Sequence, residues 1–203
     1  MAYRIGPSYD PPYDQYDIEF ADSDQALTQF FRDTPPHPAT AADSSWTNGA
    51  TIPPDLVPRR VKIIEGQDRL YDWHSARCGN LVSHAFKDII EGLGAGQHQF
   101  FPVDVVLASG TLSPETHYLF NIPHIIDSIL IEKSNLNKPL PPYGLYSPKK
   151  GPWQVAVDKA KIGSLSAWVE LKYPFQFMAD RTAKALQNAK LAGFRLYDHC
   201  HEV

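Results

Sequence analysis

Proline is the residue that most constrains what this chain can fold into. It occurs 18 times in 203 residues, with nine prolines before residue 59 and nine after it. That is about 9% of the chain, where ~5% is usual. Each proline fixes φ and removes a backbone N–H donor, so it interrupts helices and interior strands. Since the windows 59–101 and 175–203 contain none, we expect the long helices there or in the shorter gaps between prolines.

Charge is unevenly distributed along the chain. The net charge is −4. Residues 1–58 contain two arginines against nine acids, a local charge of −7, and the remainder contains 17 basic residues against 14 acids, or +3. The chain has no basic cluster of the kind that binds nucleic acid, so we expect no nucleic-acid partner. An acidic segment instead favours a partner with a basic surface.

Several protein classes are excluded by composition. Hydrophobic residues make up 43% of the chain and charged residues 21%, which is typical of a globular domain. No apolar run approaches the ~20 residues of a membrane span, and residues 1–7 lack the apolar region of a signal peptide. The two cysteines, Cys78 and Cys200, do not make a disulfide framework. We therefore expect a soluble cytoplasmic protein without a membrane partner.

The first 58 residues form an acidic, Pro/Tyr-rich arm followed by a wrapping segment. Residues 3–5 could begin a strand, and residues 7–17 alternate tyrosine, acid and proline in a pattern that favours extended chain. A short helix is expected over 21–33. Residues 34–58 either wrap the domain surface, with Trp46 and Ile52 as anchors, or link two parts. The main domain is expected over 59–203.

Hydrophobic spacing predicts the elements of that domain. Residues 80–93 have one apolar helical face, with Asn80 as a cap and glycines at the end. Strands are expected over 60–65, 101–107, 116–122 and 127–134, with Pro102 at a sheet edge or bulge. The five prolines of 135–152 predict a long exposed loop.

The last third of the chain repeats a similar plan. Strands are expected over 153–158, 166–173 and 194–198, with a helix that opens at Asp180 and ends at Gly193. The pattern predicts an α+β fold with a mostly antiparallel sheet and two main helices. A weak self-similarity at a shift of 96 residues is compatible with chance or with an ancestral duplication. It aligns Val82-Ser83 with Met178-Ala179, Ile90 with Leu186, and Phe100-Phe101 with Leu196-Tyr197.

No catalytic motif is present in the sequence. The glycines at 92, 94 and 96 follow a helix, whereas a phosphate-binding loop opens one. His74 lies near Cys78, but a Cys–His nucleophile needs spatial adjacency that sequence does not show. We expect no cofactor and no metal, with His199-Cys200-His201 as a solvated tail. The alternative is a metal-binding or small-ligand protein, or an enzyme, that uses His117, His124 or this tail.

The acidic Tyr/Asp segment is the most distinctive candidate site. Tyrosines supply rigid contact area, and carboxylates complement a basic partner. The candidate partner-binding residues are Tyr13, Asp14, Tyr16, Asp17, Glu19 and Asp22. The alternative is that the arm folds onto its own domain with these charges in water.

Five stretches of the chain carry a characteristic series of motifs: LVSHAFKDIIEGL, HQFFPVDV, HYLFNIPHIIDSILIEKS, WQVAVDKAKIGS and FMADRTAKALQNAKLAGFRL. Their features are a helix starting near Val82-Ser83, the Phe-Phe-Pro after it, a Tyr-Leu-x-Asn strand, Asp127 with Glu132 and Ser134, and a closing helix–Gly–Phe strand. In these features the chain resembles immunity protein family eleven of bacterial polymorphic toxin systems, first catalogued as a domain of unknown function. The resemblance covers about 120 residues, and residues 1–60 match least. The second family helix usually opens with serine, where this chain has Ala179.

The resemblance implies a binding protein and not an enzyme. Members of the family are thought to protect the producing cell by binding a cognate toxin. There are no catalytic residues to carry over, and toxin contacts differ between members. The expected function is therefore that of a cytoplasmic immunity protein that occludes a toxin's active site, with an oligomeric state that the sequence does not determine.

Overall fold

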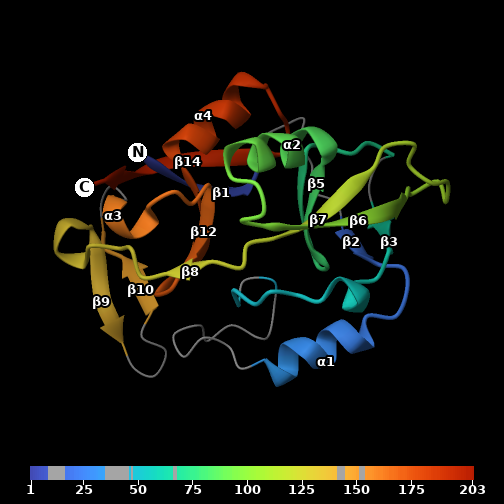
Figure 1. Cartoon of the computed structure of the whole chain (residues 1–203), viewed down its shortest axis with the longest axis horizontal. Helices are drawn as coiled ribbons and strands as arrows, with labels where there is room; N and C mark the ends of the chain where they lie inside the picture. Colours follow the sequence, from blue (N-terminus) through green and yellow to red (C-terminus); the bar gives the residue numbers. More distant parts are fainter. Residues whose placement is uncertain (9–16, 35–45, 47, 66–67, 141–144, 151–153) are drawn as a thin grey trace.

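The structure is a computed structural model that describes residues 1–8, 17–34, 46, 48–65, 68–140, 145–150 and 154–203. Within these residues, α-helices combine with two six-stranded sheets and one two-stranded hairpin (Figure 1). This confirms the expected mixture of helices and strands.

The first sheet is formed mainly by the middle of the chain. Its neighbouring strands are antiparallel except for one parallel pair, β3 with β6. In spatial order it contains β2 (Asp17–Phe20), β3 (Arg60–Glu65), β6 (Gln99–Val106), β7 (His117–Asn121), β5 (Gly79–Ser83) and β4 (Trp73–Ala76).

The second sheet joins the start of the chain to its last third. The strand β1 (Ala2–Pro7) lies in its interior, antiparallel to both neighbours, β13 (Tyr173–Ala179) and β14 (Phe194–Glu202). Ala2, Tyr3 and Ile5 are buried there, so this segment is part of the core. The remaining strands are β11 (Val155–Val157), which is parallel to β14, β12 (Ala167–Glu170), and β8 (Ile125–Ile126), which is parallel to β12.

Two helices lie side by side where the sheets meet (Figure 1). These are α2 (His84–Leu93) and α4 (Asp180–Asn188). Phe86 and Ile90 of α2 and Leu186 of α4 enter one apolar cluster that also takes residues from both sheets. The other elements are α1 (Gln25–Asp33), η1 (Pro54–Leu56), η2 (Ile131–Lys133), α3 (Lys159–Ile162) and the hairpin β9 (Leu136–Leu140) with β10 (Leu145–Pro148).

The two sheets share one plan. A hairpin, a helix and a further strand follow one another as β4–β5–α2–β6 and again as β12–β13–α4–β14. The same pairing places Val82 opposite Tyr118 and, 96 residues later, Met178 opposite Tyr3. β1 therefore occupies in the second sheet the place of β7 in the first. Matching topology and register favour a duplication over chance as the source of the self-similarity.

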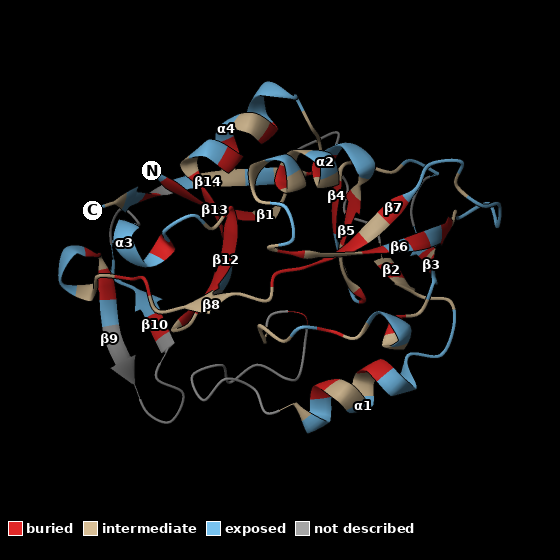
Figure 2. Ribbon diagram, viewed as in Figure 1, coloured by how far each residue is buried: buried red, intermediate tan, exposed pale blue. Residues whose placement is uncertain are grey.

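The segment before β3 packs on the first sheet. Trp46 and Ile52, the two expected anchors, are 8% and 1% exposed. The indole of Trp46 makes edge contacts with Phe31 of α1 and Phe101 of β6, each with ring centroids 6.0 Å apart. Figure 2 shows buried residues concentrated along the central strands, and blue, exposed residues along the outer faces of α1 and α4.

The helix expected over 80–93 begins later than predicted. Residues Gly79–Ser83 form β5, and Ser83 caps α2 by accepting a hydrogen bond from the Phe86 N–H at 3.2 Å. Both faces of β5 are covered, because Leu81 belongs to the core beneath α1 and Val82 to the core beneath α2. Because both of these consecutive residues are buried, the apolar spacing in the sequence predicted a helix that began too early, within the strand.

Residues 127–152 also differ from expectation. The strand expected over 127–134 is wrong: β8 ends at Ile126 and η2 covers Ile131–Lys133. The exposed loop expected over 135–152 is wrong as well, since β9 and β10 form a hairpin with Leu136 and Tyr146 buried. Both strands of a two-stranded sheet are edges, where proline is tolerated.

Two local expectations, about capping and about the chain end, are corrected, and the expectation that Pro102 lies at a sheet edge is confirmed. The cap of α4 is Ala179, without a side-chain hydrogen bond, and Asp180 instead pairs with Lys184 at 2.7 Å. Pro102 lies inside β6, at a point where β6 has β7 as its partner and β3 joins only from Asp104 onward. The segment with Cys200 is not a solvated tail, because β14 continues to Glu202 and Cys200 is 3% exposed.

A buried carboxylate holds the outer strand β8 to the second sheet. Glu170 of β12 is fully buried and accepts hydrogen bonds from Ser128, at 2.6 Å from the hydroxyl and 3.1 Å from the backbone N–H. Burial raises the pKa of Glu170 to about 7, against the lowering effect of the Ser128 bonds, and the charge of Asp127 raises it further. Lys172, at 2.7 Å from Asp127, completes the polar cluster.

A glycine lies at a close approach between the two sheets. Gly193, just before β14, has φ +95°, and a Cβ on it would lie 2.3 Å from the Trp73 carbonyl oxygen and 2.7 Å from Tyr71 Cβ. Ser8 donates its backbone N–H to the Gly193 carbonyl at 3.1 Å. Only glycine allows both this backbone conformation and this approach.

We expect Gly193→Ala to lower the free energy of unfolding by about 3 kcal/mol, because it adds a steric clash with backbone to the cost of a positive φ. Urea denaturation measures the change. Gly110→Ala is the matched control: Gly110 has φ +85° and nothing within 4 Å of an added Cβ. It should lose only about 1 kcal/mol. Equal losses in the two variants would show that the close contact is unimportant.

The Glu170 carboxyl predicts an unusual pH dependence. Its pKa is raised in the folded protein, so its contribution to stability is complete below the ordinary value of 4.5 and is lost as pH rises through about 7. This loss corresponds to about 3 kcal/mol. Glu170→Gln keeps an acceptor for Ser128 but does not ionise. We expect its stability relative to the original protein to increase from pH 4.5 to pH 8, measured by urea denaturation; parallel curves would contradict the assignment.

Candidate functional site

An acidic hollow lies where β2 ends beside the turn between β4 and β5. It measures about 330 Å³. We call it the acidic hollow, and it is lined by Glu19, Phe20, Asp22, Asp24, Arg77 and Cys78. The Arg77 backbone N–H donates to the Ile18 carbonyl at 3.1 Å, and this bond brings the β4–β5 turn against β2.

The carboxylates around this hollow differ in how far they are neutralised. Asp17 pairs with Arg77 at 2.7 Å, and Glu19 pairs with Lys62 at 3.1 Å. Asp22 and Asp24 are exposed, and neither forms an ion pair with a described residue. Asp24 accepts a hydrogen bond from the Thr28 hydroxyl at 3.4 Å. The unneutralised negative charge therefore lies at Asp22 and Asp24.

Three of the six predicted contact residues come together here. Asp17 lies in the β2–β3 pair beside the hollow, and Glu19 and Asp22 line the hollow. Tyr13, Asp14 and Tyr16 lie outside the described residues. Asp24 was missed although it belongs to the same acidic run, and Arg77 was missed because only the fold brings it next to residues that lie about 60 positions earlier.

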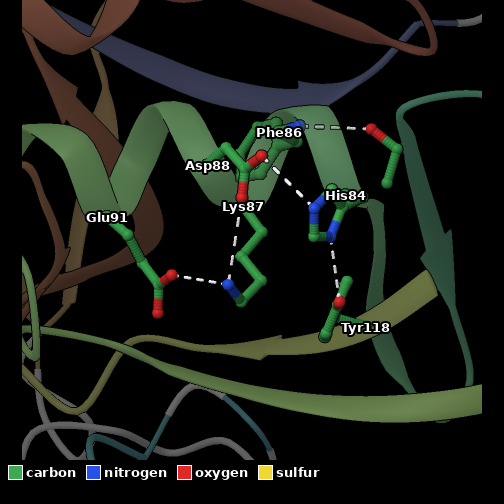
Figure 3. A network of polar contacts seen from close by, with 7 residues as sticks. His84, Phe86, Lys87, Asp88, Glu91 and Tyr118 are labelled. Atoms are coloured by element: carbon green, nitrogen blue, oxygen red, sulfur yellow. Dashed lines mark hydrogen bonds and ion pairs between the residues drawn. The ribbon is translucent and has the colours of Figure 1, made fainter. Parts of the chain in front are cut away.

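A second polar surface runs along α2 (Figure 3). His84 Nδ1 lies 3.0 Å from the Tyr118 hydroxyl, and His84 Nε2 lies 3.3 Å from an Asp88 carboxylate oxygen. Lys87 pairs with Glu91, which raises the pKa of Lys87, and its ammonium lies 5.4 Å from the Tyr118 ring centre. A hollow of about 450 Å³ adjoins this network. It is lined by Asp72, Ser83, His84, Ala85, Glu115, Thr116 and Tyr118.

The Asp88–His84–Tyr118 chain has the order of a proton relay but not its surroundings. The side chains of His84 and Asp88 are 61% and 57% exposed. Relays that move protons in catalysis act in sites from which water is excluded. This surface instead offers hydrogen bonds and charges of both signs to a partner.

The buried histidines are structural. His74 Nε2 accepts a hydrogen bond from the Tyr71 N–H at 2.8 Å, and burial, with His117 nearby, lowers the pKa of His74 to about 4. His98 lies 2.7 Å from the Ser166 hydroxyl, and burial, with His124 nearby, lowers its pKa to about 4. These imidazoles are neutral at pH 7 and serve as hydrogen-bonding core residues.

The histidines considered as metal ligands belong to different neighbourhoods. His117 lies by the Glu115 carbonyl, and His124 lies 2.7 Å from the Gln97 carbonyl. Across the described parts of the chain, no group of three His, Cys, Asp or Glu residues could hold a metal. The side chain of His199 is outside them.

The cysteines have the environment of unreactive thiols. Cys78 Sγ lies 3.8 Å from the Ile18 carbonyl, while His74 bonds to Tyr71, so no described contact makes a Cys–His pair. Burial raises the pKa of both Cys78 and Cys200 to about 12. A thiol of this kind remains protonated and is a poor nucleophile at pH 7.

Comparison with known proteins identifies the family. The model of the immunity protein family Imm11 matches residues 21–200, so the chain belongs to that family. The match includes the α2 surface and, of the acidic hollow, Asp22, Asp24, Arg77 and Cys78, while β1 and β2 precede it. A search of curated proteins finds no match. No helix in the described ranges is long and apolar enough to cross a membrane.

Proposed function

We propose that this protein is a cytoplasmic immunity protein that binds a cognate toxin of a polymorphic toxin system and neutralises it by covering the toxin's active site. The observation that carries the proposal is membership of the Imm11 family over nearly the whole chain. Supporting it, His74 and His98 are buried and neutral, and the Asp88–His84–Tyr118 chain is open to water. The surfaces available are suited to binding.

The acidic hollow is the proposed contact for the toxin. Asp22 and Asp24 are exposed and lack ion-pair partners among the described residues, so they can pair with lysines or arginines of a basic toxin surface. Arg77 and Lys62 hold Asp17 and Glu19 in place beside them. Charges at the rim of an interface accelerate encounter and set the correct orientation more than they add affinity.

Neutralisation by occlusion follows from this chemistry. A toxin that acts on an anionic substrate carries basic residues at its substrate entry, and an acidic surface placed there competes for them. Neither nucleic acid nor a membrane takes part in this proposal, because the complementary surface belongs to a protein.

The class of function is tested by co-expression with the product of the neighbouring gene as the candidate toxin. We expect the protein to restore growth of cells that produce the toxin and to co-purify with it at a fixed ratio. Rescue without co-purification would favour an activity that modifies the toxin or its target, and would contradict neutralisation by binding. No rescue at matched expression would overturn the immunity proposal.

Removal of the unpaired charges tests the contact. In the double variant Asp22→Asn/Asp24→Asn we expect association with that toxin to slow about tenfold at low salt, with a flatter dependence on salt concentration, measured by stopped-flow or surface plasmon resonance. Glu132→Gln, which removes an exposed carboxylate beside the second sheet, is the control and should change neither. Identical kinetics in the double variant would place the contact elsewhere.

A further inference from the structure

Two histidine rings meet where the two sheets join. The ring centres of His98 and His124 lie 5.6 Å apart, and the ring planes cross at 75°. His98 directly precedes β6 of the first sheet. The His124 carbonyl accepts a hydrogen bond at 2.8 Å from the N–H of Val169 in β12, a strand of the second sheet. We call these two side chains the histidine pair.

The hydrogen bonds around His98 determine which of its ring nitrogens carries the hydrogen. The Ser166 hydroxyl donates its only hydrogen to Gln97 Oε1, at 3.2 Å. The Ser166 oxygen is therefore the acceptor in its 2.7 Å contact with His98 Nε2, and Nε2 is the donor. This assignment, made from the hydrogen-bond network, leaves Nδ1 of the neutral His98 ring with a lone pair and no hydrogen.

The second ring has the same tautomer. His124 Nε2 lies 2.7 Å from the backbone carbonyl oxygen of Gln97. A carbonyl oxygen only accepts hydrogen bonds, so His124 Nε2 is the donor, and Nδ1 carries the lone pair of the neutral ring. Gln97 thus orients both rings, His98 through Ser166 and His124 directly.

The lone pair of His98 is buried and unused. The side chain is 8% exposed, and its Nδ1 has no hydrogen-bond partner among the residues that the structure describes. Phe120 packs against the ring, with ring centres 5.6 Å apart. Burial, with His124 nearby, lowers the pKa of His98 to about 4, so protons do not compete for this lone pair at pH 7. Buried polar atoms are nearly always paired, and an unpaired acceptor of this kind indicates a bound ion or water.

The spacing of the two rings suits one shared metal ion. An imidazole nitrogen binds zinc at about 2.0–2.1 Å, and the ring centre lies about 1 Å behind it, so two rings on one ion have centres at most about 6 Å apart. The observed 5.6 Å is within this limit. The surroundings fit as well, because a histidine that binds metal usually donates its other N–H to an oxygen. Gln97 and Ser166 supply those oxygens.

The donor set selects the class of metal. Imidazole nitrogen binds zinc, copper and nickel, whereas magnesium and calcium prefer oxygen ligands. No third His, Cys, Asp or Glu of the described ranges joins the pair in a group that could hold a metal. His124 is only partly buried, so water can reach an ion from that side. The site is therefore an open one with two protein ligands, unlike the closed four-ligand sites of structural zinc.

We propose that the histidine pair binds one divalent transition-metal ion, such as zinc, through the Nδ1 atoms of His98 and His124, with water completing the coordination. The bound ion links the start of β6 to the segment that pairs with β12, and so joins the two sheets. This proposal replaces the sequence-based expectation of no metal at this one place, and it does not depend on the proposed immunity function.

Zinc binding by the full chain tests the proposal. Equilibrium dialysis at pH 7 should show one zinc ion per chain with a micromolar dissociation constant, and no binding of magnesium, the control ion. His124→Gln keeps an N–H for the Gln97 carbonyl but has no imidazole, so it should weaken zinc binding about tenfold. His84→Gln is the matched control, because His84 is an exposed histidine beside Asp88 on α2; it should leave the affinity unchanged. Absence of zinc binding, or equal effects of the two variants, would overturn the proposal.

NMR of the imidazole nitrogens identifies the atoms that bind zinc. In long-range proton–nitrogen spectra we expect both rings of the pair to be Nε2–H tautomers. Zinc should then shift the Nδ1 signals of His98 and His124 and leave those of His84 in place. Zinc bound at Nε2 of the pair, or at another histidine, would contradict the assignment.

A positioning variant gives a second test with both ligands present. Ser166→Ala removes the oxygen that orients His98 but keeps both imidazoles, so it should weaken zinc binding about tenfold. Zinc should also raise the midpoint of thermal unfolding of the original protein and of His84→Gln, because it binds the folded state. The rise should be smaller in Ser166→Ala and His124→Gln, whose folding without zinc is checked by circular dichroism. Equal zinc-induced shifts in all four proteins would overturn the proposal.

Discussion

The insertion of β1 between β13 and β14 is the interaction on which the rest of the structure depends. This strand is antiparallel to both neighbours, so removing it would split the second sheet and expose the ladders on either side. It also supplies Ile5 to the core that α2 and α4 share, and Arg4 to the opposite face. The same six residues thus complete a sheet and a core.

Local chemistry made part of this fold predictable. Apolar alternation located β3, β6, β7, β11 and β12 within a few residues, and glycine correctly marked the end of α2. The end expected for α4 at Gly193 is wrong, because that helix ends at Asn188. The sequence-based predictions were wrong where both faces of a strand are buried, or where a polar segment is covered by other elements. Leu81 and Val82 imitated a helix, and the proline-rich β9–β10 hairpin looked like a loop although Leu136 and Tyr146 are buried. The central position of β1 depends on partners about 170 residues away, which no local pattern contains.

The candidate site was predictable only in part, for a related reason. The acidic run at 17–24 is visible as composition, and the fold does gather Glu19, Asp22 and Asp24 around one hollow. Which acids of that run are neutralised is decided by Arg77, from the β4–β5 turn, and by Lys62, from β3. The hollow lined by Arg4, Trp73, Phe175 and Tyr197 has no sequence signature, because these residues are adjacent only after two sheets have joined.

The pairing of β1 also determines when the protein can finish folding. During synthesis, Ala2–Pro7 leaves the ribosome about 170 residues before β13, its first partner in the chain, and still earlier than β14. The first sheet has all its strands by residue 121 and can form while β1 is unpaired. Long separations of this kind slow folding and leave strand edges open in the meantime. The short length of β1, together with Pro7 at its end, limits how well it could pair with another chain during that interval.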